Sequence, residues 1–128
     1  MSFEFNNEKA LDVLIWWVEG SDGAIDYEEE QKVQEVLSDM NYSKDIYYQD
    51  TLMYIGSLPT EKLDDLVEDA ISYANQNYSK HDKQKTVSLL HAIALSDSKI
   101  TEGEQDKIDR IKNEFGVKEL GYFQEEEE

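Results

Sequence analysis

Hydrophobic residues recur at helical spacing along almost the whole chain. Apolar side chains return every three or four positions, and no segment keeps the apolar–polar alternation of a half-buried strand. We therefore expect an all-α fold class: a single-domain helical bundle of about six helices. The five most periodic segments cover residues 8–20, 27–40, 61–75, 79–96 and 102–114.

A further helix, the third along the chain, is expected to follow Ser43, a residue type that caps helices. Its expected apolar face consists of Ile46, Tyr47, Met53 and Tyr54. The other helices also have suitable residues at their ends, because Ser, Thr and Asn cap helix starts and Gly follows helix ends. These residues are Asn7, Thr60, Ser79 and Gly116.

The first helix combines an apolar face with two adjacent tryptophans. Trp16 and Trp17 are neighbours in sequence, so they point to different faces of one helix. We expect one of them in the core, and the other is a candidate anchor for a binding partner. The apolar face comprises Leu11, Leu14, Ile15 and Val18.

One segment near the start of the chain is repeated, with changes, near its end. Laying Leu14–Val36 over Leu89–Ile111 pairs apolar residues with apolar residues at helical spacing. Between the helices both segments carry Ser-Asp-x-x-Ile-x-x-x-Glu. This duplication predicts two pseudo-repeated helical hairpins, formed by the first two and the last two helices, in a pseudo-symmetric bundle.

The repeated segment resembles the TerB-like domain of tellurite-resistance TerB proteins and of DjlA-type co-chaperones. That family has an apolar helix ending in Ala-Asp-Gly, an aliphatic residue two positions on, and an acidic residue four beyond it. Ser98 stands where the second copy would have its glycine. The matching residues are Asp22, Gly23, Ile25 and Glu29 in the first copy, and Asp97, Ile100 and Glu104 in the second.

The resemblance spans about Lys9 to Val117 and suggests a division of the chain. We expect an N-terminal extension over residues 1–6, a TerB-like helical domain over 7–117 and an acidic C-terminal tail over 118–128. The family resemblance implies a tellurite-resistance-type role in a stress response.

The charge balance restricts the partners of the protein. Thirty acidic residues against twelve basic ones give a formal net charge of −18. Such a surface repels nucleic acids and anionic membranes and attracts cations, either ions or basic proteins. We therefore expect a protein partner, no nucleic acid, and no insertion into a membrane, because the longest apolar run, VLIWWV, is too short. The opening MSFEFNNEKA lacks the pattern of a signal peptide, which favours a cytoplasmic location.

The stretch EGSDGAIDYEEE, residues 19–30, holds six carboxylates and no Lys or Arg. One interpretation is local capping. Asp26 and Glu29, like Thr101 and Glu104, have the spacing of a capping box, in which cap and glutamate each accept a bond from the other's backbone amide. Carboxylates in a first turn also gain about 0.3–1 kcal/mol each from the helix dipole. This arrangement needs no ligand.

The alternative is a bound divalent cation, and the sequence leaves it open. Hard ions such as Ca²⁺ and Mg²⁺ take several oxygen ligands, but this acidic span is too short for an EF-hand. The TerB-like resemblance also implies metal binding at these positions. The candidate ligands are Asp22, Asp26 and Glu29, with Asp97 and Glu104 as a poorer second set.

No pattern in the chain favours catalysis. The sequence lacks a phosphate-binding glycine loop and an HExxH motif, and without cysteine it has no thiol to reduce tellurite. We expect a non-enzymatic protein with no catalytic residue. Two hypotheses follow: a TerB-like stress-response module that binds divalent cations, or a metal-independent interaction domain whose acidic surface recruits a basic partner.

Overall fold

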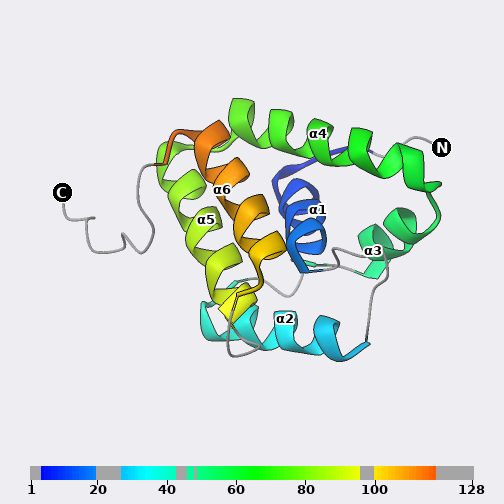
Figure 1. The fold of residues 1–128 in the computed structure, drawn as a ribbon, viewed down its shortest axis with the longest axis horizontal. Helices are drawn as coiled ribbons and strands as arrows, with labels where there is room; N and C mark the ends of the chain where they lie inside the picture. The colour runs from blue at the N-terminus through cyan, green and yellow to red at the C-terminus, as the bar shows by residue number, and fades with distance from the viewer. Residues whose placement is uncertain (1–3, 20–26, 43–45, 48, 96–99, 118–128) are drawn as a thin grey trace.

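The computed structural model describes residues 4–19, 27–42, 46–47, 49–95 and 100–117. Within these ranges the chain forms helices and no strand, which confirms the predicted all-α class (Figure 1). None of the described helices combines the length and the apolar character needed to cross a bilayer. The helices are α1 (Asn7–Glu19), α2 (Tyr27–Asp39), α3 (Gln49–Gly56), α4 (Thr60–Asn77), α5 (Lys80–Leu95) and α6 (Glu102–Phe115).

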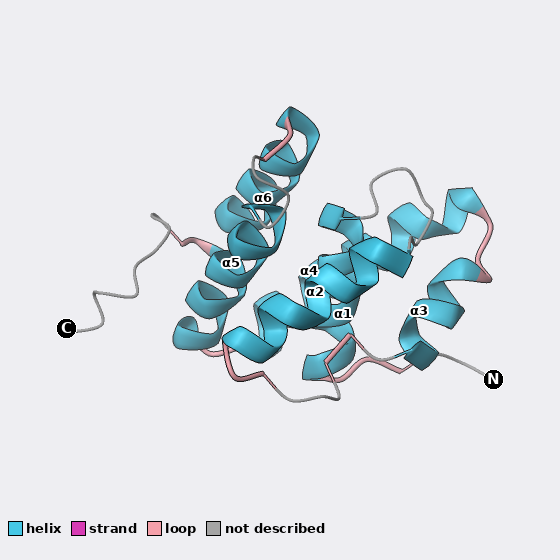
Figure 2. Ribbon diagram, turned by 90° about the horizontal axis from the view of Figure 1, so that it is seen from below, coloured by secondary structure: helices cyan, strands magenta, loops and turns pink. Residues whose placement is uncertain are grey.

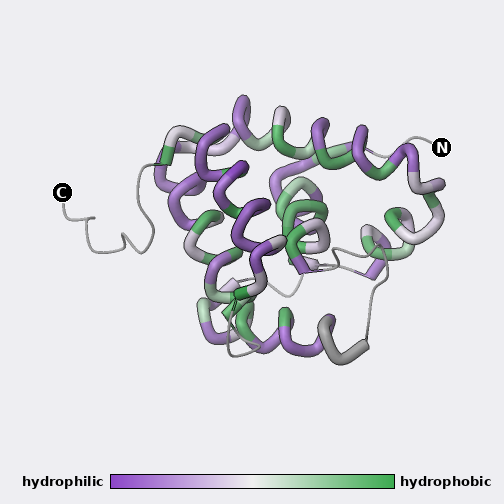
Figure 3. The backbone as a smooth tube through the Cα atoms, viewed as in Figure 1, coloured by the Kyte–Doolittle hydropathy of each residue, from purple (hydrophilic) through white to green (hydrophobic). Residues whose placement is uncertain are grey.

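Helix α1 is the centre of the bundle. It packs against α3, α4, α5 and α6, and Figure 1 shows it enclosed among them. The predicted apolar face is buried, and after the first turn so are most residues on the other sides of the helix. A helix that is apolar all round is a core helix, and the hydrophobic colour of α1 in Figure 3 shows this character. The apolar residues that α1 buries are Ala10, Leu11, Val13, Leu14, Ile15, Trp16 and Val18.

The outer helices each bury one face and expose the other. α4 packs across α1, α5 and α6 lie side by side, and α2 packs against α5 (Figures 1 and 2). Among the fully buried side chains are Leu90 and Ile93 of α5 and Ile108 and Ile111 of α6. Burying each such side chain contributes roughly 1.5–3 kcal/mol. The predicted likeness between an α1–α2 hairpin and the α5–α6 hairpin is not confirmed.

The predicted start of the third helix is wrong. α3 begins at Gln49, whereas Ile46 and Tyr47 lie in the connection before it. Tyr47 has a φ of 61°, which a right-handed helix does not allow. The Tyr47 amide donates to the Asp12 carboxylate of α1, and its carbonyl accepts from the Gln34 side chain of α2. These contacts from two other helices override the local apolar pattern.

Two predicted caps are each displaced by one residue. The side chain that caps α1 is that of Asn6, whose Oδ1 accepts from Lys9 N at 2.7 Å, and Asn7 is already helical. Thr60 is likewise inside α4. Pro59 precedes it with a φ of −66° and a ψ of 153°, and supplies no side-chain hydrogen bond.

The predicted ends at Ser79 and Gly116 are confirmed. Ser79 Oγ accepts a hydrogen bond from Asp82 N at 3.0 Å, so it caps the start of α5. Gly116 ends α6 with a φ of 74°, a backbone conformation that glycine adopts without the steric cost of a Cβ.

Candidate functional site

The structure describes only part of the predicted metal site. Asp22, Asp26 and Asp97 lie outside the described residues, and Glu29 is placed in the first turn of α2 without a described side chain. Glu104 alone among the five has a described side chain. Within the described part of the chain, no group of three or more His, Asp or Glu side chains is arranged to hold a metal ion. The ion site therefore remains a prediction.

Glu104 takes part in the capping box that its spacing predicted. Thr101 Oγ1 accepts from the Glu104 amide at 3.1 Å, and Glu104 Oε1 accepts from the Thr101 amide at 3.0 Å. Glu104 is also buried, and Ile100 packs partly against the core just before the cap. The capping interpretation is thus confirmed for the start of α6. Its counterpart at Asp26 lies outside the described residues.

Replacing Thr101 by alanine is expected to lower the free energy of unfolding by about 1 kcal/mol, because α6 loses the acceptor for the Glu104 amide. Urea unfolding followed by circular dichroism measures the change. Thr101→Ser is the matched control, since it keeps the hydroxyl group and should stay close to the original protein. Equal stability of the alanine and serine variants would show that the box contributes nothing.

The C-terminal end of α1 is held against α6 by a lysine. Lys107 Nζ donates to the Trp17 carbonyl at 2.9 Å and lies 5.4 Å from the centre of the Trp17 ring. Arg110 lies over the same ring at 5.9 Å. A cation at a helix C-terminus satisfies a carbonyl and complements the helix dipole. The Trp17 ring therefore carries two cations of the chain itself, while Trp16 is buried in the core as one of the two was predicted to be.

The contact between Lys107 and Trp17 lies near the described ends of two acidic segments. The first is residues 19–30, and the second is the later copy of the Ser-Asp-x-x-Ile-x-x-x-Glu pattern, residues 96–104. Glu19, the last residue of α1, is buried and leads into the first acidic segment. Glu104, in the first turn of α6, is the last acidic residue of the second. Because Lys107 of α6 contacts Trp17 of α1, these two helix ends belong to one region of the bundle.

Helix α4 carries a strongly acidic outer face, whose hydrophilic colour is visible in Figure 3. Arg110 of α6 contacts this face, with Nη2 2.7 Å from Glu68 Oε1. The hydrogen bond from Arg110 lowers the pKa of Glu68. Such an exposed pair is worth at most about 1 kcal/mol, so the face keeps its acidic character. The exposed acidic residues of α4 are Glu61, Asp64, Asp65, Glu68 and Asp69.

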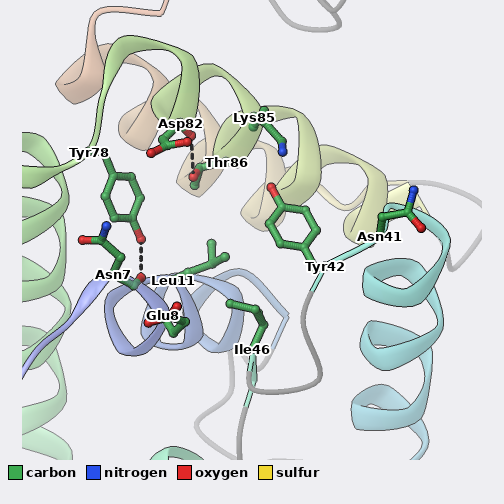
Figure 4. A pocket seen from close by; sticks show the side chains of 10 residues that line it. All are labelled: Asn7, Glu8, Leu11, Asn41, Tyr42, Ile46, Tyr78, Asp82, Lys85 and Thr86. Carbon is green, nitrogen blue, oxygen red and sulfur yellow. Dashed lines mark hydrogen bonds between the residues drawn. The ribbon is translucent and has the colours of Figure 1, made fainter.

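A groove that the sequence did not predict opens beside the first turn of α1 (Figure 4). It has a volume of about 280 Å³ and combines carboxylate, amide, ammonium and phenol groups. Its walls come from α1, from the connection between α2 and α3, and from the junction of α4 with α5. The lining residues are Asn7, Glu8, Leu11, Asn41, Tyr42, Ile46, Tyr78, Asp82, Lys85 and Thr86.

A buried carboxylate supports one wall of this groove. Asp12 is fully buried on α1 and accepts the hydrogen bond from the Tyr47 amide, next to the lining residue Ile46. Sequence reasoning missed Asp12. The available signal was a single carboxylate within residues 10–18, whose other residues are all apolar, since a buried charge persists only with polar partners.

The acidic segments and the helices around them match a known family. The family model of the tellurite resistance protein TerB matches residues 8–123, from the first turn of α1 to beyond the end of α6. No curated protein and no solved structure matches the chain. The match confirms the resemblance that the duplicated acidic pattern suggested.

Proposed function

Because this chain belongs to the TerB family, we propose that it is a non-enzymatic module of a cytoplasmic stress response of the tellurite-resistance type. In this proposal the protein acts by binding. Its net charge of −18 supports this view, since a strongly acidic surface raises the local concentration of ions or proteins of opposite charge.

The proposed ligand is a divalent cation, Ca²⁺ or Mg²⁺, at the acidic segments that precede α2 and α6. Asp22, Asp26 and Glu29 supply the first set of oxygen ligands, and Asp97 and Glu104 supply the second. Carboxylates crowded at helix starts repel one another, and a hard cation relieves that repulsion while gaining the oxygen ligands it prefers.

The observation that carries this proposal is the contact between Lys107 and Trp17. It brings the end of α1 close to the first half of α6, and each of these helix ends carries a buried glutamate, Glu19 and Glu104. The capping box uses Oε1 of Glu104, so an ion at the second segment would meet Oε2.

Thermal unfolding tests the ion proposal. An ion present at about ten times its dissociation constant stabilises the folded state by roughly 1.4 kcal/mol, which corresponds to a rise in Tm of about 4–6 °C for a small domain. Ca²⁺ or Mg²⁺ should therefore raise Tm relative to chelator, and Asp22→Asn should remove the rise.

Asp64→Asn is the matched control for this experiment, because it removes the same charge from the exposed face of α4. It should leave the ion-dependent rise intact. The proposal fails if Ca²⁺, Mg²⁺ and Na⁺ at equal ionic strength all act alike.

A second candidate function is recruitment of a basic partner protein without an ion. The exposed acidic residues of α4 favour it, because they form a charged face on one helix. Among the described residues, the pair of Arg110 with Glu68 is the ion pair seen on that face. Chelator separates the two candidates, since it abolishes an ion-dependent function and leaves charge-driven recruitment unchanged.

A further inference from the structure

The groove beside α1 already holds an ammonium group over an aromatic ring. Lys85 Nζ lies 5.2 Å from the centre of the Tyr42 ring, within the range of a cation–π interaction. Figure 4 shows the Lys85 amine directed toward Tyr42, with Asp82 on the same helix and Glu8 on α1 across the groove. Lys85 is exposed, so another cation can displace its side chain from the ring.

Among the described residues that line the groove, carboxylates outnumber cations. Glu8 and Asp82 are exposed there, and Lys85 is the one lysine or arginine of that described set. Burial, and next the negative charge of Asp82, raise the pKa of Tyr42, so its phenol stays neutral at physiological pH. Together with the acidic exterior, these groups favour a positively charged occupant over an anion.

The size of the groove restricts the occupant further. Its volume is about 280 Å³. Pockets for drug-sized ligands begin at roughly 300 Å³, so this groove is slightly smaller than the smallest of them. A single long side chain fits such a space, with its aliphatic part against Leu11 and Ile46 and its charged end near Tyr42 and Asp82.

Hydrogen bonds to the backbone fix the opposite wall. The Tyr78 hydroxyl donates to the Asn7 carbonyl at 2.8 Å and so joins the start of α5 to the first turn of α1 (Figure 4). Thr86 Oγ1 donates to the Asp82 carbonyl at 2.8 Å, and Ser79 caps the helix one turn before. The groove is therefore formed before any ligand arrives, which lowers the entropy cost of binding.

We propose that this groove binds a lysine or arginine side chain from a basic segment of a partner protein, which takes the place of Lys85 over the Tyr42 ring. The inference rests on the second candidate function and assigns it a site. Asn7 and Asn41 at the rim supply amide groups for the backbone of the bound segment.

A labelled hexalysine peptide tests the proposal by fluorescence anisotropy at low salt. Lys85→Met removes the competing ammonium group and should tighten binding about two- to fivefold. Asp82→Asn should weaken binding by a similar factor. Tyr42→Leu should weaken it roughly three- to tenfold through loss of the ring, whereas Tyr42→Phe should bind as the original protein does.

Matched controls separate the groove from the general acidity of the protein. Lys80→Met and Asp50→Asn change the same charges at exposed positions that neither line the groove nor lie on the acidic face of α4, and each should alter affinity less than twofold. Circular dichroism checks that every variant is folded. If Tyr42→Leu does not fold, the opposite effects expected of Lys85→Met and Asp82→Asn still decide the question.

Other results would overturn the proposal in distinguishable ways. Weaker or unchanged binding by Lys85→Met would mean that Lys85 does not compete with the peptide for the Tyr42 ring. If the groove variants bind hexalysine as their controls do, the groove is not the binding site, and recruitment by the acidic surface as a whole still stands. No binding of hexalysine by the original protein would reject the second candidate function itself. If the groove variants change the binding of spermine but not that of hexalysine, the ligand of the groove is a small polyamine and not a segment of a partner protein.

Discussion

The Leu14→Ala variant is expected to lose about 2–5 kcal/mol of the free energy of unfolding. Leu14 is fully buried on α1, the helix that four others surround. Truncation there removes apolar contacts on a side where neighbouring helices cannot close the cavity, because each is also fixed by other contacts. Urea unfolding followed by tryptophan fluorescence measures the loss.

Met53→Ala provides the control for this experiment. Met53 lies on α3 with 66% of its surface exposed, and surface substitutions usually change stability by less than about 0.5 kcal/mol. Similar losses in the two variants would contradict the assignment of α1 as the central helix.

The second large effect is expected for Asp12→Ala, with a loss of about 2–3 kcal/mol. The substitution removes the acceptor of the Tyr47 amide, and Tyr47 is itself buried, so its N–H loses a partner that water does not readily replace. The positive φ of Tyr47 costs free energy of its own and persists only while surrounding contacts hold it. Urea unfolding measures the stability of this variant as well.

Asp12→Asn distinguishes the hydrogen bond from the charge. Asparagine keeps a carbonyl oxygen in the same place, so this variant should be more stable than Asp12→Ala. If alanine and asparagine are equally destabilising, the Asp12–Tyr47 hydrogen bond is not the source of the effect. If Asp12→Ala loses less than about 0.5 kcal/mol, the carboxylate does not anchor the connection.

Local patterns predicted the helices well where the pattern was long and the helix contacts one side of the core. α4 and α6 are of this kind, and their predicted limits agree with the structure to within a few residues. The start of α3 was missed because Tyr47 is held by Asp12, which lies 35 positions earlier in the chain. An interaction over that separation leaves no periodic signal near residue 47.

The candidate site likewise has one part that the sequence predicted and one part that it did not. The capping box of Thr101 and Glu104 was predictable, because both partners lie within one turn and the chemistry depends on spacing alone. The groove was not predictable. Its aromatic residues Tyr42 and Tyr78 lie far apart in sequence and meet only because α5 returns alongside α1.

Calorimetric titration with Ca²⁺ decides whether the acidic segments before α2 and α6 bind a divalent cation, as we propose. We expect saturable binding by the original protein, its loss in Asp22→Asn, and its retention in Asp64→Asn. Titrations with Ca²⁺ and then Mg²⁺ that give no saturable binding, or equal weakening in both variants, would contradict the claim.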